Sequence, residues 1–481
     1  MGYETSLQLF IDGVWKSGEG RDSHEVVNPV DNSPIAAVPY ATKADLDEAL
    51  AASERAWPEW RAMDVEKRGA ILHKAAALLR ERADHIAATM TQEQGKILAE
   101  SRAEVMASAQ LFDWYAEDAK RDYGRTLVRP AGQLSRVIRQ PVGPTATFTP
   151  WNFPLYLLAK KVSAALAAGC TVILKGAPDT PWAALALGKI IKESTDIPAG
   201  VVNVITSSDN AVGVELTTNA DVDVISFTGS TPVGRQIMAA ASGTLKRVFL
   251  ELGGKSAFVM LDDGDPGMAG LFCAYAATSH SGQGCAITSR LVVPRDRLDE
   301  AVDVARTTIE GIPYGDPTDP ANMMGPLISA RQREKVAGYV DRAIADGAKA
   351  VIGGKAPEHL PKGYFYEPTL LGNVDENSAV AQDELFGPVL VVLPHDGDDD
   401  AIRVANNSIY GLSGSVVGGD RERALDVARR IRVGTMSVNG GSYYGPDAPF
   451  GGYKQAGIGR EMGVAGLAEF LELKTFAEPA V

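Results

Sequence analysis

A run of alternating apolar and alanine-rich segments between residues 144 and 241 constrains the fold of this chain most strongly. Short apolar segments at 146–148, 171–174, 201–205 and 224–227 alternate with helical patterns at 155–168, 182–193 and 233–241. This alternation is typical of a parallel sheet with helices on both faces. The sequence therefore predicts a doubly wound α/β domain, in which ligands bind beyond the carboxyl ends of the strands.

A second α/β unit is predicted from residue 255 onward. Its expected helices lie at 268–279, 297–310 and 329–346, and its expected strands at 350–352, 389–392 and 435–438. No internal repeat or long linker separates the two units. A chain of 481 residues exceeds one comfortable domain, so two domains are expected, with the turn at 251–255 as their junction.

The remaining segments predict supporting elements. Near the start, strands are expected at 7–11, 14–15 and 26–29, and helices at 65–92 and 97–119. Thr42 with Asp45 three residues later matches a capping box that begins another helix. Residues 126–129 and 134–138 predict a two-stranded ribbon, whose exposed edge would find a partner. A final strand is expected at 471–476.

The composition excludes several classes of partner. The formal net charge is −14 and the sequence pI is about 5.0, with no long run of Lys or Arg, so nucleic-acid and anionic-membrane partners are not expected. Three cysteines cannot form a disulfide framework, which favours a reducing compartment. With no signal-peptide pattern and no apolar run of membrane-spanning length, we expect a cytoplasmic protein.

Cys285 is the candidate nucleophile. Its neighbours Gly284 and Ala286 are small enough for a carbonyl carbon to approach the sulfur, and a thiolate is a strong nucleophile near neutral pH. Cys170 and Cys273 fit buried small hydrophobic residues. No two cysteines have metal-ligand spacing, so no metal site is expected. A cysteine–histidine catalyst would need a base such as His280, and this alternative stays open on sequence alone.

Two further segments could serve such a thiol. Glu251 closes an apolar strand at 248–250, where a carboxylate can have a raised pKa and act as a general base. An exposed acid at a strand end is the alternative. The loop at 228–234 follows a strand and precedes a helix, so its backbone N–H groups could hold a phosphate. It matches neither the Walker A loop nor the Rossmann glycine fingerprint.

Taken together, these segments resemble the aldehyde dehydrogenase superfamily over essentially the whole chain. The supporting stretches are TPWNFP at 149–154, Lys175 at a strand end, FTGST at 227–231, ELGGK at 251–255, GQGC at 282–285 with Arg290, ELFGP at 384–388 and PFGGYK at 449–454. Each motif is modest alone, but their order and spacing together are specific.

The resemblance implies a subunit of three parts. Residues 1–120 and 142–253 would form a cofactor-binding domain, and residues 254–455 a catalytic domain, both doubly wound and Rossmann-like. Residues 121–141 and 456–481 would form an oligomerisation ribbon and C-terminal strand. A homodimer or homotetramer is the expected assembly.

The resemblance also implies roles for the catalytic residues. Cys285 would attack a small-molecule aldehyde, and the Asn152 side-chain amide and the Cys285 backbone N–H would hold the oxyanion. After hydride transfer to the nicotinamide, Glu251 would activate the water that hydrolyses the thioester to a carboxylic acid. A relative that transfers the acyl group from the same thiol to CoA is the alternative, and the retained Glu251 argues against it. A non-enzymatic binding protein on the same fold is a second alternative, against which the retained Cys285, Glu251 and Asn152 argue together.

The cofactor is expected to be NAD or NADP. Lys175 would contact the adenosine ribose, Ser230 the pyrophosphate, Glu384 the nicotinamide ribose and Phe386 the nicotinamide ring. The other residues expected at this site are Thr149, Pro150, Trp151, Pro178, Gly213, Thr228, Gly229 and Leu252. NAD is favoured, but Pro178 stands where many NAD-preferring relatives have a Glu, which leaves NADP open.

The chain departs from its relatives elsewhere too. Lys160 replaces a frequent Trp in the substrate tunnel, and a cation there could bind a distal carboxylate; a solvated Lys is the alternative. Ser207 and Asp209 replace glycines near the adenine pocket, and His280 replaces a frequent Asn without an evident function. The expected substrate pocket comprises Phe153, Tyr156, Lys160, Tyr443, Tyr444 and Phe450, which suits an aromatic or medium apolar aldehyde.

Overall fold

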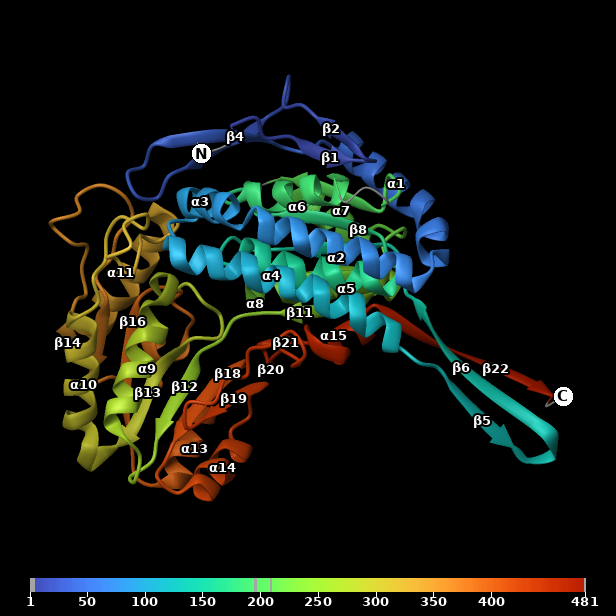
Figure 1. The fold of residues 1–481 in the computed structure, drawn as a ribbon. Helices are drawn as coiled ribbons and strands as arrows, with labels where there is room; N and C mark the ends of the chain where they lie inside the picture. The colour runs from blue at the N-terminus through green and yellow to red at the C-terminus, as the bar shows by residue number, and fades with distance from the viewer. Residues whose placement is uncertain (1–4, 194–196, 208–209, 480–481) are drawn as a thin grey trace.

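The larger sheet lies in the N-terminal body of the computed structural model, which describes residues 5–193, 197–207 and 210–479 (Figure 1). Its order is β2-β1-β9-β8-β7-β10-β11-β21. The parallel strands are β7 (Thr145–Phe148), β8 (Val172–Gly176), β9 (Val202–Thr206), β10 (Val224–Thr228) and β11 (Arg247–Glu251). The antiparallel edge strands are β1 (Leu9–Ile11), β2 (Val14–Lys16) and β21 (Gly457–Ile458). The predicted doubly wound α/β fold is confirmed.

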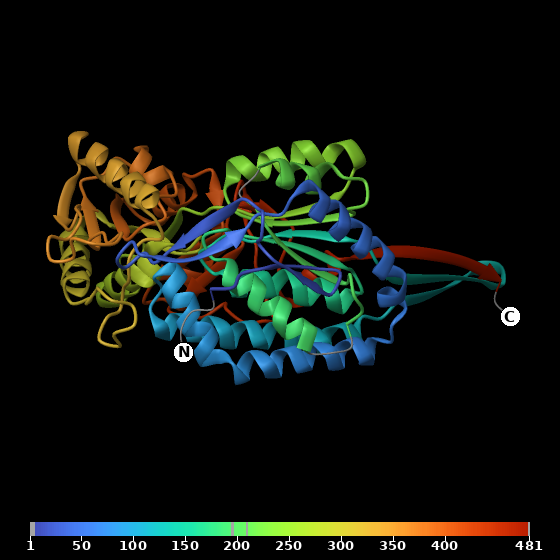
Figure 2. The same ribbon diagram turned by 90° about the horizontal axis from the view of Figure 1, so that it is seen from above.

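Helices cover this sheet (Figure 2). They are α1 (Lys43–Ala62), α2 (Val65–Glu81), α3 (Ala83–Gln94), α4 (Leu98–Asp118), α5 (Pro154–Ala168), α6 (Pro181–Glu193), α7 (Asn210–Thr218) and α8 (Thr231–Ala241). The predicted capping box of Thr42 and Asp45 begins α1. The single helix expected at 65–92 is wrong, because the backbone turns at Arg82 (φ −102°, ψ 11°) and divides it into α2 and α3.

Helix α5 is buried on all sides, which matches its apolar sequence. It packs against α4 and α2 on one side and against β7 and β8 on the other. Since α5 directly follows β7, its first turn stands at the carboxyl edge of the parallel strands.

The second sheet belongs to the other body of the molecule, in the order β14-β15-β16-β13-β12-β18-β19. Its strands are β12 (Ser256–Met260), β13 (Thr288–Pro294), β14 (Lys349–Ile352), β15 (Thr369–Gly372), β16 (Val389–His395), β18 (Ser413–Val417) and β19 (Thr435–Val438). All pairs are parallel except β14 with β15. Its helices are α9 (Pro266–Thr278), α10 (Leu298–Glu310), α11 (Ala330–Ala345), α12 (Ala379–Gln382), α13 (Asp398–Asn406) and α14 (Arg421–Arg430). The predicted second α/β unit is confirmed.

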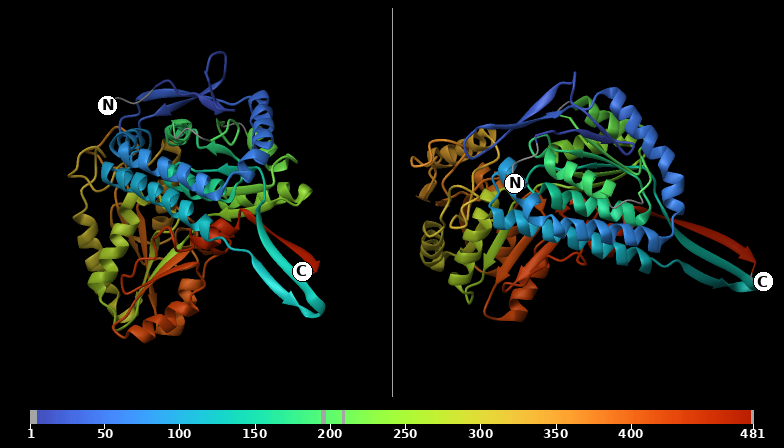
Figure 3. Two further views of the ribbon diagram at one scale, coloured as in Figure 1. Left: turned by 45° about the vertical axis from the view of Figure 1, so that its right-hand side comes forward. Right: turned by 45° about the horizontal axis from the view of Figure 1, so that its top comes forward.

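A three-stranded ribbon projects from the body and stays clear of it in both views of Figure 3. Strand β6 (Gln133–Pro141) pairs on one side with β5 (Arg125–Arg129) and on the other with β22 (Leu471–Pro479), both antiparallel. Residues between the second sheet and β22 return to the first body, where β21 pairs with β11 and α15 (Gly463–Ala468) packs against α5. The boundaries of the cofactor-binding domain, the catalytic domain and the oligomerisation ribbon stay a prediction.

Smaller pairings complete the fold: β3 (Ser23–Val27) with β4 (Pro34–Pro39), and β17 (Tyr410–Gly411) with β20 (Tyr453–Lys454). No helix among the described residues is long and apolar enough to cross a membrane. Asp209 of the predicted adenine loop lies outside the described residues, whereas Ser207 is buried.

Candidate active site

Glu251 is the last residue of β11, at the junction of the two sheets. The side chain is buried, and neither carboxylate oxygen accepts a hydrogen bond from a described residue. Burial raises the pKa of Glu251 well above its usual value and the Glu461 carboxylate raises it further, while Lys160, Lys161 and Arg460 oppose the shift. Burial therefore makes Glu251 a weaker acid than an exposed glutamate and, once ionised, a stronger base.

The turn after Glu251 comes into close contact with the thiol loop. A Cβ at Gly254 would lie 2.3 Å from the Cys285 carbonyl oxygen, so only glycine allows this approach. A Cβ at Gly451 would lie 2.7 Å from Glu251 Oε1. Glycines thus bring the carboxylate, the thiol loop and the loop at 449–454 together.

Cys285 lies partly buried between α9 and β13. Burial and the charge of Glu384 raise the pKa of the thiol to about 12, with Glu251 adding to the shift and Lys160 opposing it. Cys170 and Cys273 are fully buried, as expected. Upstream, His280 (φ 44°) and Ser281 (φ 56°) hold left-handed backbone conformations, which carry strain in residues other than glycine.

Asn152 lies four residues after β7 and is buried. Its Nδ2 donates a hydrogen bond of 3.0 Å to the Gln283 carbonyl oxygen, two residues before the thiol. Because an amide nitrogen carries two protons, one N–H remains beside the thiol loop to meet an oxyanion. Burial and the nearby Lys96 cation lower the pKa of His280 well below the usual value, so this ring is a weaker base than an ordinary histidine.

A cavity of about 190 Å³ joins the thiol to most of the residues expected to hold the cofactor. Its lining includes Asn152 and Cys285. The other lining residues are Pro150, Trp151, Thr228, Gly229, Ser230, Leu252, Gly253, Gln332, Lys335, Glu384 and Phe386. These residues come from the carboxyl ends of β7, β10 and β11 and from the second body, which is where ligands bind in such sheets.

The second body contributes Glu384 and Phe386 to the cavity. Glu384 Oε1 accepts a hydrogen bond of 2.9 Å from the Gly254 N–H, and burial raises the pKa of this carboxyl to about 7. Phe386 has a φ of 62° and packs edge-on against Trp151, with ring centroids 5.5 Å apart. The carboxylate and the ring face the same space, as a ribose and a nicotinamide would require. Gln332 and Lys335, on α11, were missed by the sequence analysis.

Four of the expected cofactor residues lie away from this cavity. Lys175 is near the end of β8, its carbonyl oxygen accepts a hydrogen bond of 3.2 Å from the Thr149 N–H, and burial lowers its pKa. Pro178 is half-buried in the following turn. Gly213 is on α7, where a Cβ would meet no atom within 4 Å. These positions surround the sheet edge next to β9, which suits the adenosine half of a dinucleotide.

Lys160 is buried on α5 among aromatic rings and carboxylates. Its Nζ lies 4.1 Å from the Phe450 ring centroid and 4.8 Å from that of Tyr156. Its nearest carboxylate is Glu461 Oε2 at 3.7 Å. Burial alone lowers the pKa of Lys160, but the acidic groups Tyr156, Glu461 and Glu251 outweigh it and the pKa lies above its ordinary value. The ammonium is therefore charged at neutral pH.

The other predicted pocket residues divide into two groups. Tyr444 stacks on Phe450 with centroids 6.4 Å apart, and Tyr443 contacts Tyr444 at 4.6 Å, so both tyrosines extend the aromatic wall around Lys160. Phe153 instead packs against the His280 ring at 5.6 Å and beneath the Lys96 ammonium at 3.8 Å. The structure does not bring Phe153 into the cluster around Lys160.

The sequence analysis missed the buried charges beside this wall. Lys161 Nζ donates a hydrogen bond of 2.5 Å to Glu461 Oε1 and lies 3.0 Å from the Ser226 hydroxyl. A buried lysine inside an apolar helix was the available signal, but its partner lies 300 residues away in the chain.

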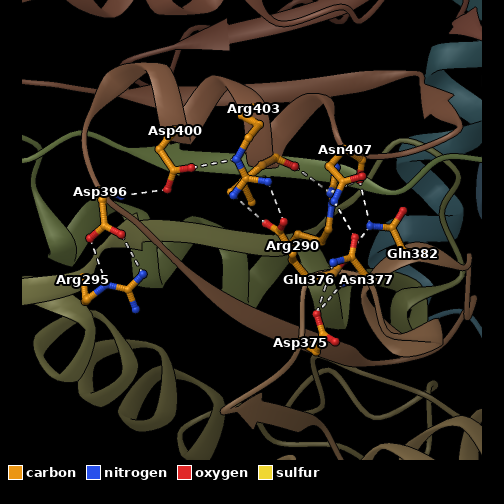
Figure 4. A network of polar contacts seen from close by, with 11 residues as sticks. Arg290, Arg295, Asp375, Glu376, Asn377, Gln382, Asp396, Asp400, Arg403 and Asn407 are labelled. Atoms are coloured by element: carbon orange, nitrogen blue, oxygen red, sulfur yellow. Dashed lines mark hydrogen bonds and ion pairs between the residues drawn. The ribbon is translucent and has the colours of Figure 1, made fainter.

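Arg290 is buried on β13 in the second body. Its guanidinium donates to the carbonyl oxygens of Lys255 and Ala405, both at 2.9 Å, and to those of Val404 and Asn407 at 3.2 Å. Figure 4 shows this side chain pointing to Asn407, beside the ion pair of Glu376 with Arg403. Arg290 thus ties the Glu251 turn and the end of α13 to β13.

Comparisons with known proteins agree with this arrangement. The profile of the Aldehyde dehydrogenase family matches residues 15–476. The betaine aldehyde dehydrogenase of Bacillus subtilis (strain 168) is 39% identical over 474 residues, 98% of this chain and 96% of its own. The NADP(+) succinate-semialdehyde dehydrogenase of Escherichia coli (strain K12) is 37% identical, covering 97% of this chain and 96% of its own.

A solved structure has the same fold. The betaine aldehyde dehydrogenase of Staphylococcus aureus in complex with NAD+ matches with a TM-score of 0.96 at 34% identity, over 99% of this chain and 95% of that one. A profile match over most of the chain and relatives above 30% identity at nearly full length identify the chain. It belongs to the aldehyde dehydrogenase family.

Proposed function

We propose that this enzyme oxidises an aldehyde to the carboxylic acid through a covalent intermediate on Cys285, with Asn152 as the oxyanion donor and Glu251 as the base for water. The single observation that carries the proposal is the cavity that holds both the Cys285 thiol and Asn152 among the residues expected at a dinucleotide. Family membership supplies the reaction class, aldehyde oxidation with NAD(P)+.

In the first step the Cys285 thiol gives up its proton to solvent, and Sγ bonds to the aldehyde carbon as the carbonyl π bond breaks, which forms a thiohemiacetal. Charge develops on the former carbonyl oxygen during this step. The second N–H of Asn152 Nδ2 and the Cys285 backbone N–H meet that charge, and a single such donor is worth about 10²–10³ in kcat. The donor is already in place because Asn152 is held to the Gln283 carbonyl.

NAD(P)+ supplies the hydride acceptor when bound. Glu384 and Phe386 would hold its ribose and nicotinamide, Ser230 would receive its pyrophosphate at the start of α8, and Lys175 would contact its adenosine ribose. The space fits because Gly253 approaches Glu384 without a side chain: a Cβ there would lie 2.5 Å from Glu384 Oε2.

Hydrolysis of the resulting thioester needs a base, and Glu251 is the group proposed for it. Its carboxylate oxygens are buried and make no hydrogen bond to a described residue, so they are available to accept a proton from water. Since its pKa is raised, the carboxylate, once formed, is a stronger base than an exposed Glu.

We propose an aldehyde with a distal carboxylate as the substrate. Lys160 is the buried cation beside the aromatic wall, with its ammonium 4.1 Å from the Phe450 ring centroid and 3.7 Å from Glu461. A cation at this place favours an anionic semialdehyde over a cationic one such as betaine aldehyde, whose quaternary ammonium would be repelled. The aromatic wall of Tyr156, Phe450 and Tyr444 would contact the substrate's apolar middle.

The enzyme is proposed to act as a cytoplasmic homodimer or homotetramer. The ribbon supports assembly, because Val128 is 83% exposed and Leu473 71% exposed on it, and exposed strand edges with apolar side chains favour pairing with another chain.

The experiment that tests the proposed reaction follows NADH and NADPH formation by near-ultraviolet absorbance with succinate semialdehyde, an aliphatic aldehyde and benzaldehyde. We expect turnover by the wild type and none by Cys285→Ala, with the acid as product. Equal turnover by Cys285→Ala would overturn the assignment of the nucleophile. Turnover that requires CoA would replace hydrolysis by acyl transfer.

A further inference from the structure

The first two turns of α4 contact both halves of the active site. Glu100 and Glu104 lie one turn apart on this helix and point to the same side, because residues four apart share a helix face. Glu104 contacts the segment that carries Asn152, and Glu100 contacts the loop that carries Cys285. Lys96 lies two residues before the helix and forms an ion pair with Glu104.

Glu104 completes the start of α5. Helix α5 begins after Phe153, whose side chain makes no capping hydrogen bond, so its first N–H groups need another acceptor. Glu104 Oε1 accepts from the Leu155 N–H at 2.9 Å and from the Tyr156 N–H at 3.0 Å. A carboxylate here also meets the positive end of the helix dipole.

Lys96 fixes the backbone of Asn152 itself. Its fully buried ammonium forms an ion pair with Glu104 and donates a hydrogen bond of 2.8 Å to the Asn152 carbonyl oxygen. It also lies 3.8 Å from the centroid of the Phe153 ring. The Asn152 backbone and the residues that follow it are therefore held by Lys96 and by Glu104 of α4.

Glu100 holds the loop that carries Cys285. Its carboxylate accepts hydrogen bonds from the His280 N–H at 3.1 Å and from the Ser279 hydroxyl at 2.6 Å. His280 has the left-handed backbone conformation described above, and such conformations persist only where the surroundings enforce them. The loop then continues to Gln283, whose N–H and side-chain amide both donate to the His280 carbonyl at 3.1 Å.

These contacts close a circuit. From Glu100 the hydrogen bonds run to His280 and Gln283, from Gln283 to the Asn152 amide, from Asn152 to Lys96, and from Lys96 to Glu104 on the same helix. A closed circuit of buried polar groups is stiffer than its separate bonds, because each bond restricts the next. The distance between the Asn152 amide and the thiol loop is set within it.

We propose that Lys96, Glu100 and Glu104 are positioning residues that fix the Asn152 amide relative to Cys285, with the start of α4 as their rigid support. They do not touch the substrate. The inference rests on the proposed roles of Asn152 and Cys285, because a displaced amide matters only if it stabilises the oxyanion.

The first test compares Glu104→Ala with Glu104→Gln. Alanine removes the acceptor for the start of α5, whereas glutamine keeps an oxygen there. We expect Glu104→Ala to lower kcat by about ten- to a hundredfold, the loss typical of a small misplacement of catalytic groups, with the KM for NAD(P)+ nearly unchanged. Glu104→Gln should recover most of the loss. An unchanged kcat in folded Glu104→Ala contradicts the proposal.

The second test separates positioning from general damage. In an Asn152→Ala background, Glu104→Ala should have little further effect on kcat, because the group that it positions is already gone. Equal losses in both backgrounds would mean that Glu104 acts elsewhere. Asp45→Asn is the matched control: Asp45 also pairs with a cation and takes part in a helix cap in the same body, but its partners there are Arg21 and Thr42, which are outside the circuit, so its kcat should match the wild type.

The third test addresses Glu100. We expect Glu100→Ala to change the rate at which iodoacetamide alkylates Cys285, because the thiol loop loses its support, whereas Glu104→Ala leaves this rate near the wild-type value. If Glu104→Ala changes the alkylation rate and Glu100→Ala does not, then Glu100 does not support the thiol loop. If Cys285→Ala or Asn152→Ala retains the full rate of NAD(P)H formation, the proposed function fails. That outcome is distinct from failure of the positioning role.

Discussion

At the scale of single residues, two buried charged groups set the chemistry of the site. Glu251 has a raised pKa and makes no hydrogen bond to a described residue, and Lys160 keeps its charge within 3.7 Å of Glu461. Burial makes each group's charge more effective, because the surroundings screen it less than water would.

We expect Glu251→Gln to form the thioester but to hydrolyse it slowly. A rapid burst of NAD(P)H should remain, followed by a steady rate lowered by about 10²–10⁴, the usual contribution of general base catalysis. In the wild type, the folded pKa of Glu251 lies above its ordinary value, so the reactive carboxylate is lost as pH falls through this raised pKa. Stopped-flow absorbance and a pH profile of kcat measure both effects. Loss of the burst itself would place Glu251 in the first step.

Lys160→Met should discriminate between substrates. Methionine keeps the length of the side chain and removes the charge, so kcat/KM for succinate semialdehyde should fall by roughly tenfold more than that for benzaldehyde, as expected for a lost charge pair of moderate strength. Lys160→Arg serves as the control that keeps the charge. Equal losses on the two aldehydes would show that Lys160 does not bind the distal carboxylate.

At the scale of elements, the turn between β8 and α6 decides how the adenosine end of the cofactor meets the protein. Lys175 precedes this turn, Pro178 lies in it, and Asp179 beside it already pairs with His24 at 3.0 Å. Pro178 offers neither a hydrogen-bond donor nor a charge, so position 178 itself does not repel a 2′-phosphate.

A carboxylate at position 178 should change the cofactor preference. We expect Pro178→Glu to raise the KM for NADP+ relative to that for NAD+ by roughly tenfold, because like charges placed together disfavour the phosphate. Steady-state kinetics with both cofactors measure the ratio, and Pro178→Gln controls for the loss of proline. A shift of equal size in Pro178→Gln would assign the effect to the backbone.

At the scale of the whole molecule, two α/β bodies meet at the β11–β12 connection and a ribbon extends away from them (Figure 1). The active site belongs to the junction, so neither body contains all of its residues. The ribbon makes its pairs within β5, β6 and β22 and leaves the far edge of β5 without a neighbouring strand among the described residues.

Charge on the ribbon should weaken the assembly. We expect Leu473→Glu to shift the protein toward the monomer in analytical ultracentrifugation, because a carboxylate cannot be buried at an interface without a partner. Leu245→Glu is the matched control, since Leu245 is 90% exposed but lies on the body. An unchanged sedimentation coefficient for Leu473→Glu would place the interface elsewhere.

Much of this protein follows from its sequence alone. The alternation of strands and helices predicted the first parallel sheet and a second α/β unit, and local patterns singled out Glu251 at a strand end and Cys285 beside glycines. Asn152 followed only from the resemblance to the aldehyde dehydrogenases. Local patterns carry this information because period, capping and strand ends depend on neighbouring residues.

Only the tertiary structure decided how the buried charges pair. Glu104 caps a helix that begins 50 residues later, Lys161 meets Glu461 from the far end of the chain, and Phe153 faces Lys96 rather than the Lys160 cluster. The sequence also did not predict the pairing of β21 with the first sheet or the break between helices at Arg82. A buried charge must find a partner to offset its lost hydration, but nothing in its local sequence names that partner, because the pairing depends on which segments the fold brings together.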